Sequence, residues 1–241
     1  MKNHLSPPKA DPPRAEKFQI YTKPWIKLET AAEKKKRAAQ IVRVLGKTYP
    51  NAKIALMYQN DIQLLVAVIL SAQCTDKKVN EVTALLFKKY KTAKDFASAK
   101  QAIFEKEIYQ TGFYRAKAKN IIAACKKIET AFGGRLPRTM ENMLTLPGVA
   151  RKTANVVLGN AYGIVEGIAI DTHMIRLSQR MGFTKQTDPV KIEKKLMALF
   201  PKKQWFELTY MLINHGRAIC EAKKPKCAEC PLNKLCPSAL V

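Results

Sequence analysis

Residues 144–158 read LTLPGVARKTANVVL, and this stretch decides the fold of the chain. Pro147 disfavours helix in the residue before it, and Gly148 can adopt a positive φ at little cost. A short helix therefore ends here, and a second helix begins almost at once. The free backbone N–H groups and the dipole at the start of that second helix suit a phosphate. We therefore interpret the stretch as a helix-hairpin-helix, which would contact a nucleic-acid backbone through Gly148, Ala150 and Arg151.

The rest of the chain, from Glu29 onward, has the hydrophobic period of α-helices. The segment 61–72 is nearly all apolar, which predicts a buried central helix. Gly133 and Gly134 predict the end of another helix. Further helices are expected over 33–47, 75–90, 115–132 and 204–214, and from Asp188-Pro189 onward. No stretch alternates apolar and polar residues as an exposed strand does. The sequence predicts an all-α fold.

The charge of the chain points to a polyanionic partner. Lysine and arginine number 43 against 19 acidic residues, which gives a formal charge of +24. An excess of this size favours a nucleic-acid partner. The alternative explanation of the charge is a lysine-rich proteome in which every protein surface is basic. The alternative to the hairpin is an ordinary turn between two packed helices. The N-terminus has no apolar signal segment and the run 64–70 is too short to span a bilayer. We therefore expect an intracellular protein without a membrane partner, and a flexible basic tail over 1–28.

Four of the six cysteines lie close together near the C-terminus. Cys220, Cys227, Cys230 and Cys236 follow the spacing C-x6-C-x2-C-x5-C. Disulfides are rare inside cells, so the cluster favours a metal. Zinc sites usually pair their cysteines in two short units, and here only Cys227 and Cys230 are so paired. Because four thiolates suit either zinc or iron–sulfur, the spacing alone leaves both metals open.

Two residues near the hairpin are candidates for chemistry. Lys152 falls in the first turn of the second helix, where a lysine binds phosphate or is solvated. The positive end of a helix also disfavours the ammonium form, and a neutral amine can attack an electrophilic carbon. Asp171 precedes a predicted helix and suits its N-cap. It could also face Lys152 and stabilise a developing cation at a sugar.

The chain resembles the endonuclease III family of bifunctional DNA glycosylases, in the helix-hairpin-helix superfamily, over about residues 30–237. The resemblance rests on five motifs in the same order. They are LSAQCTD (70–76), GFYRAKA (112–118), LPGVARKTANVVL (146–158), IDTH (170–173) and the cysteine quartet.

The resemblance implies a [4Fe–4S] cluster bound by Cys220, Cys227, Cys230 and Cys236. It also implies that the loop with Lys223, Lys224 and Lys226 contacts DNA phosphates, and that Gln73 fills the gap left by an extruded nucleotide. Lys152 is then the nucleophile and Asp171 the essential carboxylate. The implied reaction removes an oxidised pyrimidine from duplex DNA and cleaves 3′ to the abasic site by β-elimination through a Schiff base.

The implied architecture has two all-α domains with the DNA groove between them. A six-helix barrel would span 54–165, and a second domain, carrying the cluster, would combine 29–53 with 166–241. Lys152 would belong to the barrel and Asp171 to the cluster domain. We expect a monomer acting on damaged DNA, cytoplasmic and associated with the nucleoid if the source is bacterial.

Two residues depart from the family pattern. Ala150 stands where a second hairpin glycine is usual; we expect it to be helical, with the hairpin intact. Phe113 stands where an aliphatic wedge is usual, although a phenyl ring can still insert between bases.

Two other functions are open from the sequence. One is a monofunctional adenine or mismatch glycosylase, although such enzymes usually lack the lysine. The other is a non-catalytic iron–sulfur module that binds DNA, against which intact Lys152 and Asp171 argue.

Overall fold

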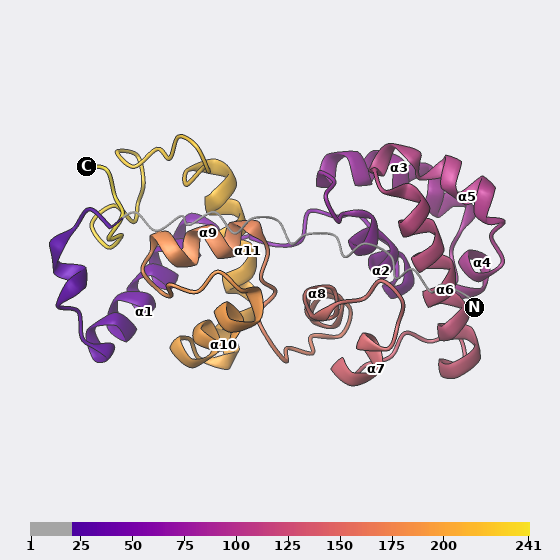
Figure 1. Ribbon diagram of the computed structural model, residues 1–241, viewed down its shortest axis with the longest axis horizontal. Coiled ribbons are helices and arrows are strands. Elements are labelled where there is room, and N and C mark those ends of the chain that lie inside the picture. The colour runs from indigo at the N-terminus through magenta and orange to yellow at the C-terminus, as the bar shows by residue number, and fades with distance from the viewer. Residues whose placement is uncertain (1–20) are drawn as a thin grey trace, which may run out of the picture.

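A computed structural model describes residues 21–241, and within that range every regular element is a helix (Figure 1). The helices of the middle part of the chain are α2 (Asp61–Leu70), α3 (Asp76–Lys89), α4 (Ala93–Ala97), α5 (Gln101–Glu107), η2 (Tyr109–Thr111), α6 (Tyr114–Phe132), α7 (Met140–Leu144) and α8 (Arg151–Tyr162). The other elements are η1 (Pro24–Lys27), α1 (Ala31–Thr48), α9 (Thr172–Arg180), α10 (Pro189–Leu199), η3 (Lys202–Gln204) and α11 (Trp205–Ala218). The all-α prediction is confirmed. None of the helices over 21–241 combines the length and apolar character needed to cross a membrane.

Side-chain caps explain where most helices begin. Thr30 caps α1 in a capping box with Glu33, which returns a bond to the Thr30 backbone. Further caps are made by Asn60, Thr75, Thr92, Thr139, Asp171 and Asp188. Gly133 ends α6 in the left-handed region, as its sequence predicts.

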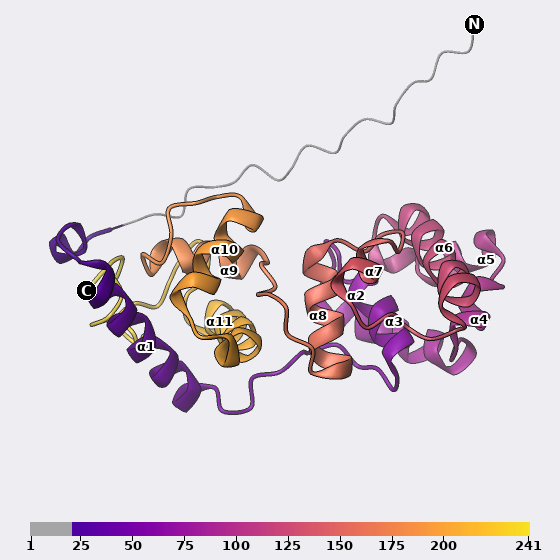
Figure 2. The ribbon, with the colours of Figure 1, turned by 90° about the horizontal axis from the view of Figure 1, so that it is seen from below.

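The helices form two groups, each around its own hydrophobic core (Figures 1 and 2). The first core extends from Leu56 to Leu158, and α2 lies in it with all but its first residue buried. The second core combines α1 with residues of α9, α10 and α11. The chain crosses between the groups before α2 and again after α8 (Figure 2). The exact domain boundaries given by the sequence stay a prediction.

Part of the predicted N-terminal tail is ordered. Residues 1–20 lie outside the described range, but the end of the predicted tail packs against the C-terminal segment. The Thr22 and Lys23 amides donate to the carbonyl of Pro237 at 2.9 and 3.0 Å. The prediction of a flexible tail is therefore wrong for these residues, because their backbone groups have partners far away in the sequence.

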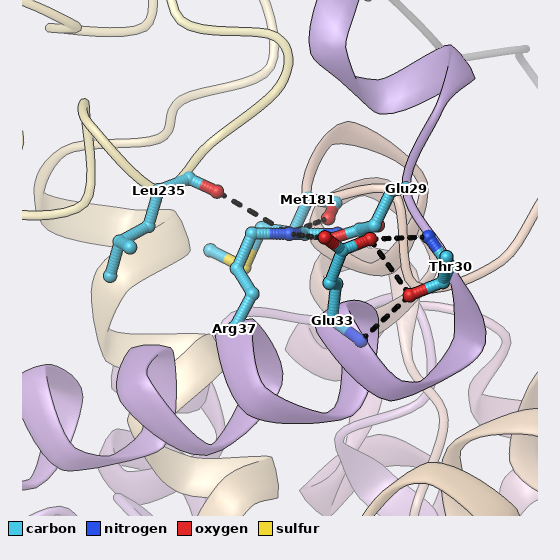
Figure 3. A network of polar contacts seen from close by, with 6 residues as sticks. All are labelled: Glu29, Thr30, Glu33, Arg37, Met181 and Leu235. Atoms are coloured by element: carbon cyan, nitrogen blue, oxygen red, sulfur yellow. Dashed lines mark hydrogen bonds and ion pairs between the residues drawn. The ribbon is translucent and has the colours of Figure 1, made fainter.

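Arg37 of α1 secures the same region (Figure 3). Its guanidinium binds the Glu29 carboxylate at 2.6 and 2.9 Å, and both side chains are nearly buried. The remaining nitrogen donates to the carbonyls of Met181 at 2.7 Å and Leu235 at 3.3 Å. One side chain thus joins the N-terminal segment to the loop that carries the last cysteine.

Candidate active site

The turn between α7 and α8 forms the predicted hairpin. Gly148 has a φ of +76°, which favours glycine. A Cβ at Gly148 would also lie 2.8 Å from the Cβ of Asn120 on α6, so both the turn and the packing require glycine there.

Ala150 differs from its prediction. It is extended rather than helical, with φ −96° and ψ 171°, because it is the N-cap of α8 and only its carbonyl joins the helix. Its negative φ avoids the strain that alanine would meet in the left-handed region. Its side chain cannot cap, so the first N–H groups of α8 have no side-chain partner.

Lys152 and Asp171 line the same pocket, between the two groups of helices. Lys152 is exposed in the first turn of α8, and Asp171 is half-buried just before α9. Their pocket has about 590 Å³ of empty space, open solvent included. Residues from both groups of helices line this pocket, so a molecule that enters it from solvent would meet both side chains.

Asp171 also caps α9, which leaves part of its carboxylate available. Its Oδ1 accepts a hydrogen bond from the Met174 amide at 2.8 Å. Within the part of the chain that the structure describes, Oδ2 makes no hydrogen bond. The carboxylate can therefore cap the helix through one oxygen and act in the pocket through the other.

An ion pair spans the rim of this pocket. Arg217 of α11 contacts Asp76, the first residue of α3, at 2.7 Å. The pair connects the two groups of helices beside Lys152 and Asp171. Nothing in the sequence pattern singles out Arg217, because its partner lies 141 positions away.

Gln73 and Phe113 are the two non-glycine residues with positive φ in the described range, at 52° and 47°. Such conformations cost on the order of 1–3 kcal/mol each and cluster at functional sites. Both side chains are exposed. Buried Lys117 joins their loops, since its Nζ donates to the carbonyls of Leu70 and Thr111 at 2.7 Å each. Burial lowers the pKa of Lys117.

The four clustered cysteines line one pocket, together with Arg180 and His215. All six cysteines of the chain are free thiols. Arg180 Nη1 donates to Cys220 Sγ at 3.4 Å, and His215 Nε2 lies 3.6 Å from Cys230 Sγ. Burial raises the pKa of the Cys230 thiol to about 11 and that of the Cys236 thiol to about 12. These thiols stay protonated at neutral pH unless a metal displaces the protons.

The shared pocket brings the four cysteines into one region of the fold. Over residues 21–241, no three His, Cys, Asp or Glu side chains are grouped so as to hold a single metal ion. An iron–sulfur cluster, like zinc, can be bound by four thiolates.

The loop between the first two of these cysteines presents three exposed lysines, Lys223, Lys224 and Lys226. Lys226 lies 3.8 Å from the carboxylate of Glu221, and both side chains are about half exposed, so its charge remains accessible.

A family model and a known protein both match this chain over much of its length. A family model described as HhH-GPD superfamily base excision DNA repair protein matches residues 66–202. The endonuclease III of Synechocystis sp. is 54% identical over 212 residues, covering 88% of this chain and 97% of that protein.

Two solved structures are similar over most of the chain. One is a non-covalent endonuclease III–DNA complex, and the other is a trapped endonuclease III–DNA covalent intermediate with an estranged adenine. Each has a TM-score of 0.81 and 40% sequence identity, and covers 85% of this chain and 96% of the solved chain.

Proposed function

Because the chain belongs to the endonuclease III family of helix-hairpin-helix base excision repair proteins, we propose that Lys152 and Asp171 act together on damaged pyrimidines in duplex DNA. The protein is a bifunctional DNA glycosylase, which removes a base and then cleaves the strand at the abasic site. Both side chains line one pocket between the two cores, and this shared position supports their joint role in the reaction. Both come from one chain, so a monomer suffices for the reaction.

Binding begins at the DNA backbone. The uncapped N–H groups at the start of α8 donate hydrogen bonds to a phosphate oxygen, and Arg151, Lys223, Lys224 and Lys226 add positive charge. Gln73 and Phe113 project from their strained loops into the base stack and fill the gap left by the damaged nucleotide. The nucleotide turns out of the duplex into the pocket with Lys152.

The chemistry takes place at the sugar. The Lys152 amine attacks C1′ of the deoxyribose, and the base leaves with the electron pair of the glycosidic bond and takes up a proton. The ring opens to a protonated imine between Lys152 and C1′. Loss of a proton from C2′ then expels the 3′ phosphate, which is a β-elimination that cleaves the strand. Asp171 stabilises the cationic sugar and moves protons through Oδ2.

Borohydride trapping tests this proposal, because it reduces the imine to a stable amine. The wild-type protein is expected to form a covalent adduct with duplex DNA that contains thymine glycol or an abasic site, and none with undamaged duplex. Adenine opposite a mismatched base serves as the comparison substrate for a monofunctional glycosylase. Base release without any trapped adduct would contradict the imine, and no base release at all would leave only a DNA-binding module.

We assign Cys220, Cys227, Cys230 and Cys236 as the ligands of a [4Fe–4S] cluster. The four cysteines line one pocket, and the membership of the chain in the endonuclease III family favours an iron–sulfur cluster over zinc. When bound, such a cluster ties the C-terminal segment together through four Fe–S bonds and so holds the basic loop in place.

The purified protein is expected to be brown and to contain iron and acid-labile sulfide in equal amounts, about four of each per chain. Replacing Cys230 by alanine should abolish the visible absorbance and make residues 220–241 sensitive to proteases, because the segment loses its anchor. Cys125→Ala is the matched control, since Cys125 is buried in the other core and should keep full iron content. Stoichiometric zinc in place of iron, or unchanged iron in Cys230→Ala, contradicts the assignment.

A further inference from the structure

We infer that Glu193 is a positioning residue for the reaction, because its buried carboxylate joins the helix that carries Lys152 to the segment that carries Asp171. The inference rests on the proposed function, which gives those two residues their roles. Glu193 lies on α10, whose neighbouring residues Ile192 and Leu196 belong to the second core.

Three donors converge on this carboxylate. Oε2 accepts from Arg151 Nε at 2.7 Å. Oε1 accepts from Asn155 Nδ2 at 3.0 Å and from the Ile168 amide at 3.2 Å. The Glu193 side chain is only 6% exposed, so these bonds are formed largely away from water.

The donors belong to the two pieces of chain that meet at the pocket. Arg151 and Asn155 are on α8, directly before Lys152 and about one turn after it, and α8 packs in the first core. Ile168 lies three residues before Asp171, in the segment that leads to α9. Glu193, from the second core, thus fixes the start of α8 against the approach to Asp171.

The chain passes so close to the carboxylate that a side chain at residue 167 would displace it. A Cβ at Gly167 would lie 2.0 Å from Glu193 Oε1 and 2.9 Å from Asn155 Nδ2. The segment before Asp171 therefore has little freedom to move while Glu193 keeps its bonds.

The carboxylate is also the one hydrogen-bonding partner of the Asn155 side chain in the described residues, because Asn155 Oδ1 has none. Arg151 is held by its ion pair with Glu193 beside Lys152. Losing Glu193 would release both side chains of α8 together with the Ile168 amide. A displacement of about 1 Å at a reacting group costs roughly 10²-fold in rate.

Glu193→Gln, which keeps the size of the side chain and removes its charge, tests this role. In single-turnover assays on DNA with a preformed abasic site, the rate constant of strand cleavage should fall by about 10- to 100-fold. The affinity for the same DNA should not weaken, because the substitution removes a negative charge beside Arg151. Gly167→Ala should also lower the rate constant of cleavage without weakening DNA binding, because the new Cβ displaces the carboxylate. It does so without any change of charge.

The amplitude of the single turnover separates positioning from folding. A merely structural residue would lower the fraction of active protein and leave the rate constant of that fraction unchanged, and that result overturns the inference. Glu207→Gln, the same change at an exposed position of α11, is the control and should match the wild type. Wild-type rate constants in both Glu193→Gln and Gly167→Ala also overturn it.

Lys152→Ala, assayed in parallel, identifies which proposal has failed. An adduct that persists in Lys152→Ala contradicts the proposed function itself. If Lys152→Ala is inactive while Glu193→Gln and Gly167→Ala cleave at the wild-type rate, only the positioning role is wrong.

Discussion

Replacing Lys152 by alanine is expected to abolish covalent trapping and to lower strand cleavage at an abasic site by more than about 10³-fold, the order seen when a nucleophile is removed. The reason is that no imine forms without the primary amine. The lysine is exposed in the first turn of α8, so its side chain contributes little to the core. Alanine is also the best helix former, and the melting temperature should therefore stay within a few degrees.

A second substitution separates charge from nucleophilicity. Lys152→Arg keeps a positive charge near the DNA, but a guanidinium stays protonated and cannot form the imine. It should bind abasic DNA with near wild-type affinity and still give no adduct. Lys126→Ala, at an exposed position of α6, is the control for Lys152→Ala, because it also removes one surface charge. The two measurements are borohydride trapping and DNA affinity at fixed salt, because charge effects depend on ionic strength.

Full trapping by Lys152→Ala would assign the nucleophile to another amine, such as the N-terminal one. Loss of trapping in both Lys152 variants together with a normal melting temperature would support the assignment. Loss of DNA binding in Lys152→Ala alone would point instead to the phosphate-binding role that the residue type also allows.

Local sequence signals predicted the helices well where a helix has several turns and a side-chain cap. The predicted range 75–90 differs from α3 by one residue at each end, and 115–132 differs from α6 by one residue at its start. The short helices α4 and α5, with five and seven residues, were not predicted, because so few turns show no clear period. Ala150 was misjudged because an N-cap is half inside the helix, and only backbone angles separate the two states.

The partners of the candidate site could not be predicted in the same way. Glu193 lies 42 positions from Arg151, and Arg217 lies 141 positions from Asp76. Lys117 contacts a carbonyl 47 positions away. Such contacts depend on how the helices pack in three dimensions. The hydrophobic period of a segment and the spacing of its motifs carry no information about that packing. The motifs alone place Lys152 and Asp171 in the sequence; the fold brings them to one pocket.

Asparagine at position 171 is expected to leave the fold intact and to reduce the rate of base release and cleavage by about 10²- to 10⁴-fold, the usual contribution of a general acid–base group. Asparagine caps a helix as well as aspartate does, so the bond from the Met174 amide to Oδ1 can persist. The substitution removes the negative charge that stabilises a cationic sugar. Single-turnover kinetics and a melting curve on the same preparation measure the two effects separately.

Asp188 offers a control with the same geometry. It caps α10 through a bond from the Lys191 amide to Oδ1 at 2.9 Å, and it does not line the pocket that Lys152 shares with Asp171. Asp188→Asn makes the same chemical change at an equivalent N-cap, so it should leave both stability and rate unchanged. Any loss found in Asp171→Asn but absent in Asp188→Asn then belongs to the pocket and not to helix capping.

Asp171→Ala completes the comparison, because it removes both the cap and the charge. It should lower the free energy of unfolding by about 1 kcal/mol relative to Asp171→Asn, the usual value of an N-cap. If the carboxylate acts only as a cap, Asp171→Asn will cleave at the wild-type rate and only Asp171→Ala will be impaired. Equal loss of rate in the two variants, with stability lost in alanine alone, instead requires that one oxygen holds α9 while the charge acts on the sugar.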